Sequence, residues 1–248
     1  MDSKKKDIIL DSKIYDNKLE VWIIQSDESE EEMEDAYSVF DNNEGNNIII
    51  TLSDGLGGHP YGKQASETLV QAVGEIPYRS TEQFVKEIND CLVQKKECGY
   101  ATMSSIFINF STEKIEVLYI NSGDTTIHRI DNSKGKLEQL SINHTDEKEY
   151  LERGLDELTA RFYAKLTSCI GIEQQPEYHA GKIEINKQDV LVLATDGGYS
   201  LLVESAWKET VRLKYPKIQR NYIYNLLHRN ISKADDNITV AIVTFCNF

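Results

Sequence analysis

Hydrophobic residues follow two different periods along this chain, and each period predicts a kind of element. Short runs rich in apolar and β-branched residues, bounded by turn-forming residues, predict strands. These runs lie at residues 18–25, 36–40, 48–52, 101–110, 115–121, 125–130, 136–140, 181–185, 189–195 and 238–245. The turn-rich residues 41–47 also predict a hairpin between the second and third runs.

Helical spacing replaces the strand period in four other segments. The apolar face of the first predicted helix consists of Ala65, Leu69, Ala72, Val73 and Ile76, and the helix ends at Pro77. Further helices are predicted at residues 81–95, near 203–213 and at 216–230, whereas the charged residues 145–165 predict a mobile flap or short helices. Strand runs that alternate with helix pairs, without a strict strand–helix–strand rhythm, favour an α+β layered sandwich.

Three aspartates stand at the ends of predicted strands. Asp54 and Asp196 each follow an apolar run and precede a glycine, and Asp236 precedes Asn237 and the last run. Each aspartate taken singly is also typical of a turn. Strand ends that are distant in sequence can converge in space, and the usual reason to gather carboxylates is a hard cation bound through oxygen. Together the three predict a metal-dependent hydrolase.

Composition limits the class of protein and its partners. The 248 residues are 40% hydrophobic, which fits one sizeable domain or at most two small ones, and we expect a single domain over residues 1–248. The net charge is -14. This acidity argues against nucleic acid or an anionic membrane as a partner. The apolar residues 8–10 are too short for a signal-peptide core, and no stretch is long enough to span a bilayer. The four cysteines lack metal-ligand spacing, so we expect reduced thiols and, with no targeting signal in view, a cytoplasmic location. We also expect a monomer, although nothing in the sequence fixes the oligomeric state.

Ordered sequence blocks connect these features to a known family. The blocks are Met33-Glu34-Asp35-Ala36, Asp54-Gly55-Leu56-Gly57-Gly58-His59, Asn121-Ser122-Gly123-Asp124, Leu166-Thr167-Ser168-Cys169-Ile170-Gly171, Asp196-Gly197, and Asp236-Asn237-Ile238-Thr239-Val240. With them the chain resembles the type 2C metal-dependent protein serine/threonine phosphatases, the bacterial branch most closely, from about residue 18 to the end. The resemblance implies a four-layer α-β-β-α sandwich of two antiparallel sheets flanked by helices.

The resemblance also implies two Mn²⁺ or Mg²⁺ ions per chain at one edge of the sandwich. Asp54 would bridge both ions, and the Gly55 carbonyl would bind one of them. Asp196 and Asp236 would hold one ion, while Asp35 would complete the other side. These four aspartates are the expected catalytic residues.

Other residues have supporting roles by the same resemblance. Asp124 would hold a third, more weakly bound ion, and its alternative role is that of an ordinary hairpin residue. Glu34, His59 and Asn237 are expected around the ligands, although His59 precedes Pro60 and favours a role in pinning its loop.

The implied reaction is hydrolysis of phosphoserine or phosphothreonine in a phosphorylated protein, as part of signal transduction. Two divalent ions can activate a water and neutralise the phosphoryl oxygens as charge develops. Oxygen ligands without Cys or His favour Mg²⁺ or Mn²⁺ over zinc.

Four positions depart from the family pattern. Glu30 stands where the family has a phosphate-binding arginine, which predicts weaker substrate binding because a carboxylate repels phosphate. The family's Asp-Ser-Arg triplet is Asp124-Thr125-Thr126 here. Leu56 replaces a histidine of some members, which leaves the acid for the leaving group unassigned, and Ser200 replaces an acidic residue.

Two alternatives stay open at this point. The first is a pseudophosphatase-like binding module that keeps the fold and recognises a regulatory partner, favoured by the lost arginine and the acidic residues 27–35. The second keeps the chemistry but serves one regulatory protein, with residues 145–165 setting substrate fit.

Overall fold

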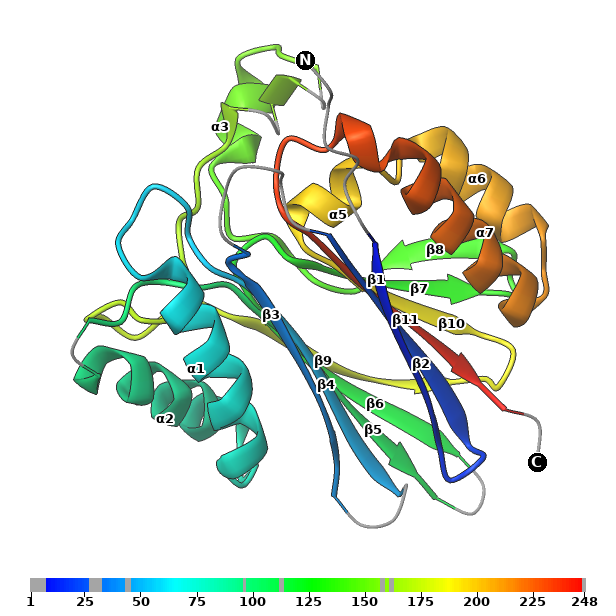
Figure 1. Ribbon diagram of the computed structural model, residues 1–248, viewed down its shortest axis with the longest axis horizontal. Coiled ribbons are helices and arrows are strands. Elements are labelled where there is room, and N and C mark those ends of the chain that lie inside the picture. The colour runs from blue at the N-terminus through cyan, green and yellow to red at the C-terminus, as the bar shows by residue number, and fades with distance from the viewer. Residues whose placement is uncertain are drawn as a thin grey trace.

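Two antiparallel sheets pack face to face, and helices cover both outer sides (Figure 1). The computed structural model describes residues 8–26, 33–42, 46–95, 97–111, 114–156, 159–160 and 163–246. This arrangement confirms the expected four-layer α+β sandwich.

The first sheet has six strands, and one of its two edge strands was not predicted. In spatial order the strands are β1 (Ile9–Tyr15), β2 (Leu19–Ser26), β11 (Ile238–Phe245), β10 (Val190–Ala194), β7 (Thr126–Asp131) and β8 (Lys136–Gln139). Strand β1 escaped prediction because six of its seven residues are exposed, so it shows no alternation of apolar and polar positions.

The second sheet has five strands and carries two helices on its outer face. Its order is β3 (Asp35–Asp41), β4 (Asn47–Asp54), β5 (Met103–Phe110), β6 (Ile115–Ser122) and β9 (His179–Ile185). Helices α1 (Gly62–Glu75) and α2 (Thr81–Gln94) cover it. Leu69, Val73 and Ile88 of these helices are fully buried in one cluster with Ile49 of β4, because the apolar stripe of each helix faces the sheet.

Three helices cover the outer face of the six-stranded sheet: α5 (Asp196–Ser200), α6 (Glu204–Arg212) and α7 (Pro216–Asn230). A 3-10 turn, η1 (Ile231–Lys233), follows α7. Proline at the start of α7 suits a first helical turn, since its missing N–H would have no partner there. The short helix α3 (Glu147–Glu152) lies in the segment predicted as a flap or short helices.

The apolar centre between the sheets leaves one end of the sandwich to polar residues. Ile50, Ile106, Leu193 and Val243 belong to the central cluster and have no exposed surface. Strands β4 and β10 end, and strands β3 and β11 begin, at the same end of the molecule. No helix in the described ranges has the length and apolar character needed to cross a bilayer.

Candidate functional site

The structure places the predicted aspartates at the end of the sandwich where strands β4 and β10 end and strands β3 and β11 begin. Asp35 and Asp54 lie directly opposite each other on β3 and β4. The Thr195 hydroxyl, at the end of β10, donates to Asp35 Oδ2 at 2.9 Å. A residue of the five-stranded sheet is thus bonded to the six-stranded sheet, which places Asp196 next to the same point.

The charges of these aspartates act on one another. Burial raises the pKa of Asp54 well above its usual range, and the charges of neighbouring carboxylates raise it further. Those neighbours are Asp196, Asp35, Asp124 and Asp236. Burial also raises the pKa of Asp35, with Asp196 and Asp236 adding to the effect, although hydrogen bonds from Thr239 and Thr195 oppose it. Because the effect of a charge falls with distance, the five carboxylates share one region.

The five aspartates of this cluster differ in how deeply they are buried. Asp35 is buried, Asp54 and Asp124 are partly buried, and Asp196 and Asp236 are exposed. The deepest carboxylate is therefore held by the protein, whereas the outer ones face solvent, so a substrate could reach them.

The donor chemistry fits a hard divalent cation. Crowded carboxylates need either protons or positive charge between them, and oxygen donors suit Mg²⁺ or Mn²⁺. Within the described ranges, however, no three Asp, Glu, His or Cys side chains form a group that could hold an ion as they stand. The aspartates are neighbours, and a bound ion would require their side chains to turn toward it.

Gly55 permits a close approach between the end of β4 and the start of α1. A Cβ at this position would lie 2.3 Å from the Gly62 carbonyl oxygen and 2.9 Å from that of Glu34. The Glu34 side chain lies against the first turn of α1, since a Cβ on Gly62 would be 2.7 Å from its Oε1. Asn237 Oδ1 accepts from the Glu34 N–H at 2.7 Å, which links this turn to the start of β11.

The segments around Asp196 and Asp236 also meet through a glycine. Thr195 stands at the N-cap position of α5 without a side-chain capping bond, and Asp196 begins this short helix instead of a simple turn. A Cβ on Gly197 would lie 2.1 Å from the Asn237 carbonyl oxygen. Each aspartate accepts from the N–H that follows it, at 2.6 Å for Asp196 and 2.7 Å for Asp236, which orients one oxygen of each carboxylate.

A threonine pair connects Asp124 with Asp54. Thr102 Oγ1 accepts from the Asp54 N–H at 3.0 Å and lies 2.6 Å from Thr125 Oγ1. Gly123, at φ 104°, precedes Asp124, and a Cβ there would lie 2.6 Å from Thr102 Cγ2. The backbone therefore requires glycine both for its conformation and for the space.

The two histidines of these segments hold loops. Burial lowers the pKa of His144, so its neutral ring can accept at Nδ1 from the Gly123 N–H at 3.2 Å. His59 lies in the exposed turn before α1, with its ring edge-to-face on Tyr100 at 5.5 Å. This placement agrees with a role in pinning the loop.

The departures from the family pattern have different structural consequences. Glu30 lies outside the described residues. Thr126 is buried and donates to the Ala194 carbonyl at 3.3 Å, so this side chain is directed into the six-stranded sheet. Ser200 closes α5 by donating to the Gly197 carbonyl at 2.8 Å.

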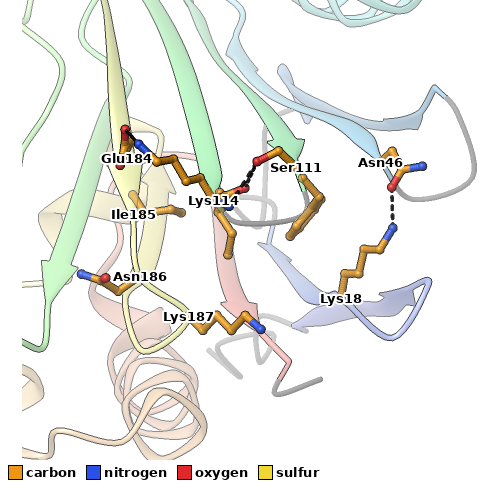
Figure 2. A pocket seen from close by; sticks show the side chains of 10 residues that line it. Lys18, Asn46, Ser111, Lys114, Glu184, Ile185, Asn186 and Lys187 are labelled. Carbon is orange, nitrogen blue, oxygen red and sulfur yellow. Dashed lines mark hydrogen bonds and ion pairs between the residues drawn. The ribbon is translucent and has the colours of Figure 1, made fainter.

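A cavity of about 710 Å³ lies at the other end of the sandwich, away from the carboxylates. Figure 2 shows its lysines: Lys114 donates to Glu184 at 2.7 Å, and Lys18 donates to Asn46 at 2.6 Å. Lys114 precedes β6 and Asp124 follows it, so the length of that strand separates the cavity from the cluster.

Sequence reasoning missed Thr195, Thr239 and Thr102, which bond the aspartates. Each is a threonine within or beside an apolar run, close to an aspartate or glycine of the family sequence blocks. This position is the one signal in the sequence that could have identified them. In an isolated sequence such a threonine is also an ordinary strand residue.

Comparison with known proteins decides the family. Residues 27–220 match the family model of protein phosphatase 2C. The chain belongs to this family. Membership confirms the predicted class of enzyme, a protein serine/threonine phosphatase. A relative from Listeria welshimeri, the serine/threonine phosphatase stp, is 24% identical over 228 residues, which cover 85% of this chain and 89% of the relative.

Solved structures of other proteins share the fold. Stp1 from Staphylococcus aureus superposes with a TM-score of 0.71 at 18% identity, covering 90% of this chain and 94% of Stp1. RsbX in complex with magnesium superposes with a TM-score of 0.70 at 15% identity, covering 96% of this chain and 100% of RsbX. This protein phosphatase 2C member therefore shares the sandwich fold of these proteins over nearly its whole length.

Proposed function

We propose that this protein phosphatase 2C member hydrolyses phosphoserine and phosphothreonine in phosphorylated proteins with two Mn²⁺ or Mg²⁺ ions. One observation carries the proposal: Asp35 and Asp54 lie opposite each other at one end of the sandwich, and Thr195, which precedes Asp196, is bonded to Asp35 at 2.9 Å. The magnesium in the related RsbX structure supports the choice of a hard cation.

The residues have distinct roles in this proposal. Asp54 would serve both ions, and the Gly55 carbonyl would hold one of them. Asp196 and Asp236 would hold one ion, while Asp35, with Glu34 beside it, would serve the other. Asp124 would hold a weaker third ion. Their positions at converging strand ends support these roles, because strand ends are rigid and hold short side chains in place.

The bound ions would supply the positive charge that activates a water and neutralises the phosphoryl oxygens. The chain's own contribution is to orient that charge: hydrogen bonds from Thr195 and Thr239 hold Asp35, and backbone N–H groups hold Asp196 and Asp236. The exposed outer aspartates keep this end of the sandwich open to a phosphorylated side chain.

The proposal also covers the setting of the reaction. Residues 1–248 form one catalytic domain that acts as a monomer in the cytoplasm. The described cysteines, which are Cys91, Cys98, Cys169 and Cys246, are all free, and this supports a reducing compartment. The net charge of -14 supports a protein partner in preference to nucleic acid or an anionic membrane.

The test is turnover of a phosphoserine peptide by the full chain during a Mn²⁺ titration. Asp54→Ala and Asp196→Ala should each abolish turnover. Asp90→Ala is the matched control, because Asp90 is paired with Lys86 on the surface of α2 and should leave turnover unchanged. A wild-type chain that binds Mn²⁺ but hydrolyses neither this peptide nor a small aryl phosphate refutes the proposal.

The rival function is a pseudophosphatase that binds a regulatory partner. Glu30 in place of the family arginine and the acidic residues 27–35 favour it. Calorimetry separates the two functions, because the rival predicts no binding of Mn²⁺ at millimolar concentration.

A further inference from the structure

Asp35 is a buried carboxylate whose hydrogen-bond donors come from the opposite sheet. It begins β3 in the five-stranded sheet, whereas its partners Thr195 and Thr239 stand at the end of β10 and near the start of β11. Both threonines have no exposed surface, and Asp35 is 6% exposed. Buried polar groups of this kind are costly unless each is bonded, so the contact has to be satisfied inside the protein.

The direction of the first bond follows from the atoms around the Thr195 hydroxyl. Thr195 Oγ1 accepts from the Thr239 N–H at 3.0 Å, and its single proton can then go to one of two acceptors. Asp35 Oδ2 is 2.9 Å away, while the Thr239 carbonyl oxygen is 3.4 Å away. The shorter contact is the better hydrogen bond, so the hydroxyl donates to Asp35.

The second hydroxyl is oriented in the same way. Thr239 Oγ1 accepts from Gln25 Nε2 of β2 at 3.1 Å, which leaves the Thr239 proton for the side-chain bond to Asp35. Asp35 thus receives two hydroxyl protons, each fixed by a donor behind it. The two donors oppose the rise in the pKa of Asp35 that burial causes. A carboxylate already held in one orientation also loses little further freedom when a cation binds.

We propose that Thr195 and Thr239 are positioning residues, which hold Asp35 in the orientation that binds a divalent cation and so set the affinity of the site. The inference rests on the proposed function, because it takes Asp35 as a ligand. Partners that orient a metal ligand typically change affinity by about 10- to 100-fold when they are removed.

The test measures Mn²⁺ affinity of the full chain by calorimetry. Thr195→Val replaces the hydroxyl with a methyl group of similar size and should weaken binding about tenfold. Thr195→Ser keeps the hydroxyl and should stay within about twofold of the wild type. Thr210→Val is the matched control, since this buried threonine of α6 donates to the Ala206 carbonyl at 2.8 Å and should leave affinity unchanged.

A kinetic measurement separates positioning from a general loss of structure. Turnover by Thr195→Val should fall at limiting Mn²⁺ and recover at saturating Mn²⁺, with KM for the phosphopeptide unchanged. If Thr195→Val does not fold, Thr239→Val carries the same test.

The outcomes are distinct. Valine variants that bind Mn²⁺ within twofold of the wild type overturn the inference while the proposed function stands. A Thr195→Ser variant as weak as Thr195→Val also overturns it, because packing would then explain the loss. A wild-type chain that binds no Mn²⁺ overturns the proposed function itself.

Discussion

Gly197→Ala should separate two of the aspartates without removing either. The added Cβ would lie 2.1 Å from the Asn237 carbonyl oxygen and 3.1 Å from Asp236 Cβ, whereas ordinary contacts begin at 3.4 Å. Relief of the first contact requires the backbone before β11 to move away from α5 by about 1 Å. Because Asp196 and Asp236 lie on the two sides of this contact, the distance between them has to change.

The size of the effect follows from two terms. Overpacking of a well-packed site costs about 1–3 kcal/mol, which in a chain of this size lowers Tm by about 2–12 °C. A displacement of about 1 Å in a catalytic arrangement can reduce turnover about 100-fold. We therefore expect a modest loss of stability together with a large loss of kcat and of Mn²⁺ affinity.

The assay compares this variant with Gly57→Ala, which also adds one methyl group near the same end. There the nearest atom to the new Cβ is Glu34 Oε2 at an ordinary 3.4 Å, so turnover should stay near that of the wild type. Thermal unfolding and phosphopeptide kinetics are measured on both. Full turnover and unchanged Mn²⁺ affinity in Gly197→Ala would show that the contact between α5 and the start of β11 does not set the site.

Three further predictions concern charge. In metal-free protein the raised pKa of Asp54 means that the folded state keeps the Asp54 proton to higher pH than the unfolded chain does, so Tm should fall as pH rises from 5 to 9. Asp54→Asn should make this fall in Tm less steep. An equally steep fall in the variant would contradict the assignment. Asp131 has the opposite sign: burial opposes its ionisation, but hydrogen bonds from Ser133 and Lys134 and the charge of Arg129 hold its pKa below the usual range. Its stabilisation is thus present at neutral pH and lost as pH falls below the usual range of an aspartate, so Asp131→Asn should lower Tm at pH 7 by an amount that shrinks with acidification below pH 4 in thermal scans. Glu30→Arg should lower KM for a phosphopeptide with little change in metal affinity, because a guanidinium binds phosphate through paired hydrogen bonds; an unchanged KM in steady-state kinetics would show that another group captures the phosphate.

The elements that the sequence predicted are those with a buried face. Strands β4, β10 and β11 were predicted because their runs are almost wholly buried and mostly apolar. Strand β1 was missed because its apolar residues Ile9 and Ile14 are exposed, and α5 was missed because its sequence contains Gly197 and Gly198, which are poor helix formers.

The residues of the candidate site also differ in whether local sequence predicts them. Asp54, Asp196 and Asp236 could be found from strand ends alone. Asp35 could not, because it adjoins an acidic run that looks solvated, yet it is 6% exposed and bonded across the sandwich. That bond depends on the pairing of strands distant in sequence, which local patterns do not contain.

The most direct test of the central claim is a crystal structure grown with millimolar Mn²⁺, with anomalous scattering used to locate the ions. The account predicts two manganese peaks within coordinating distance of Asp35, Asp54, Asp196 and Asp236, one on each side of Asp54. A map without manganese among these carboxylates, in a correctly folded chain, would contradict it.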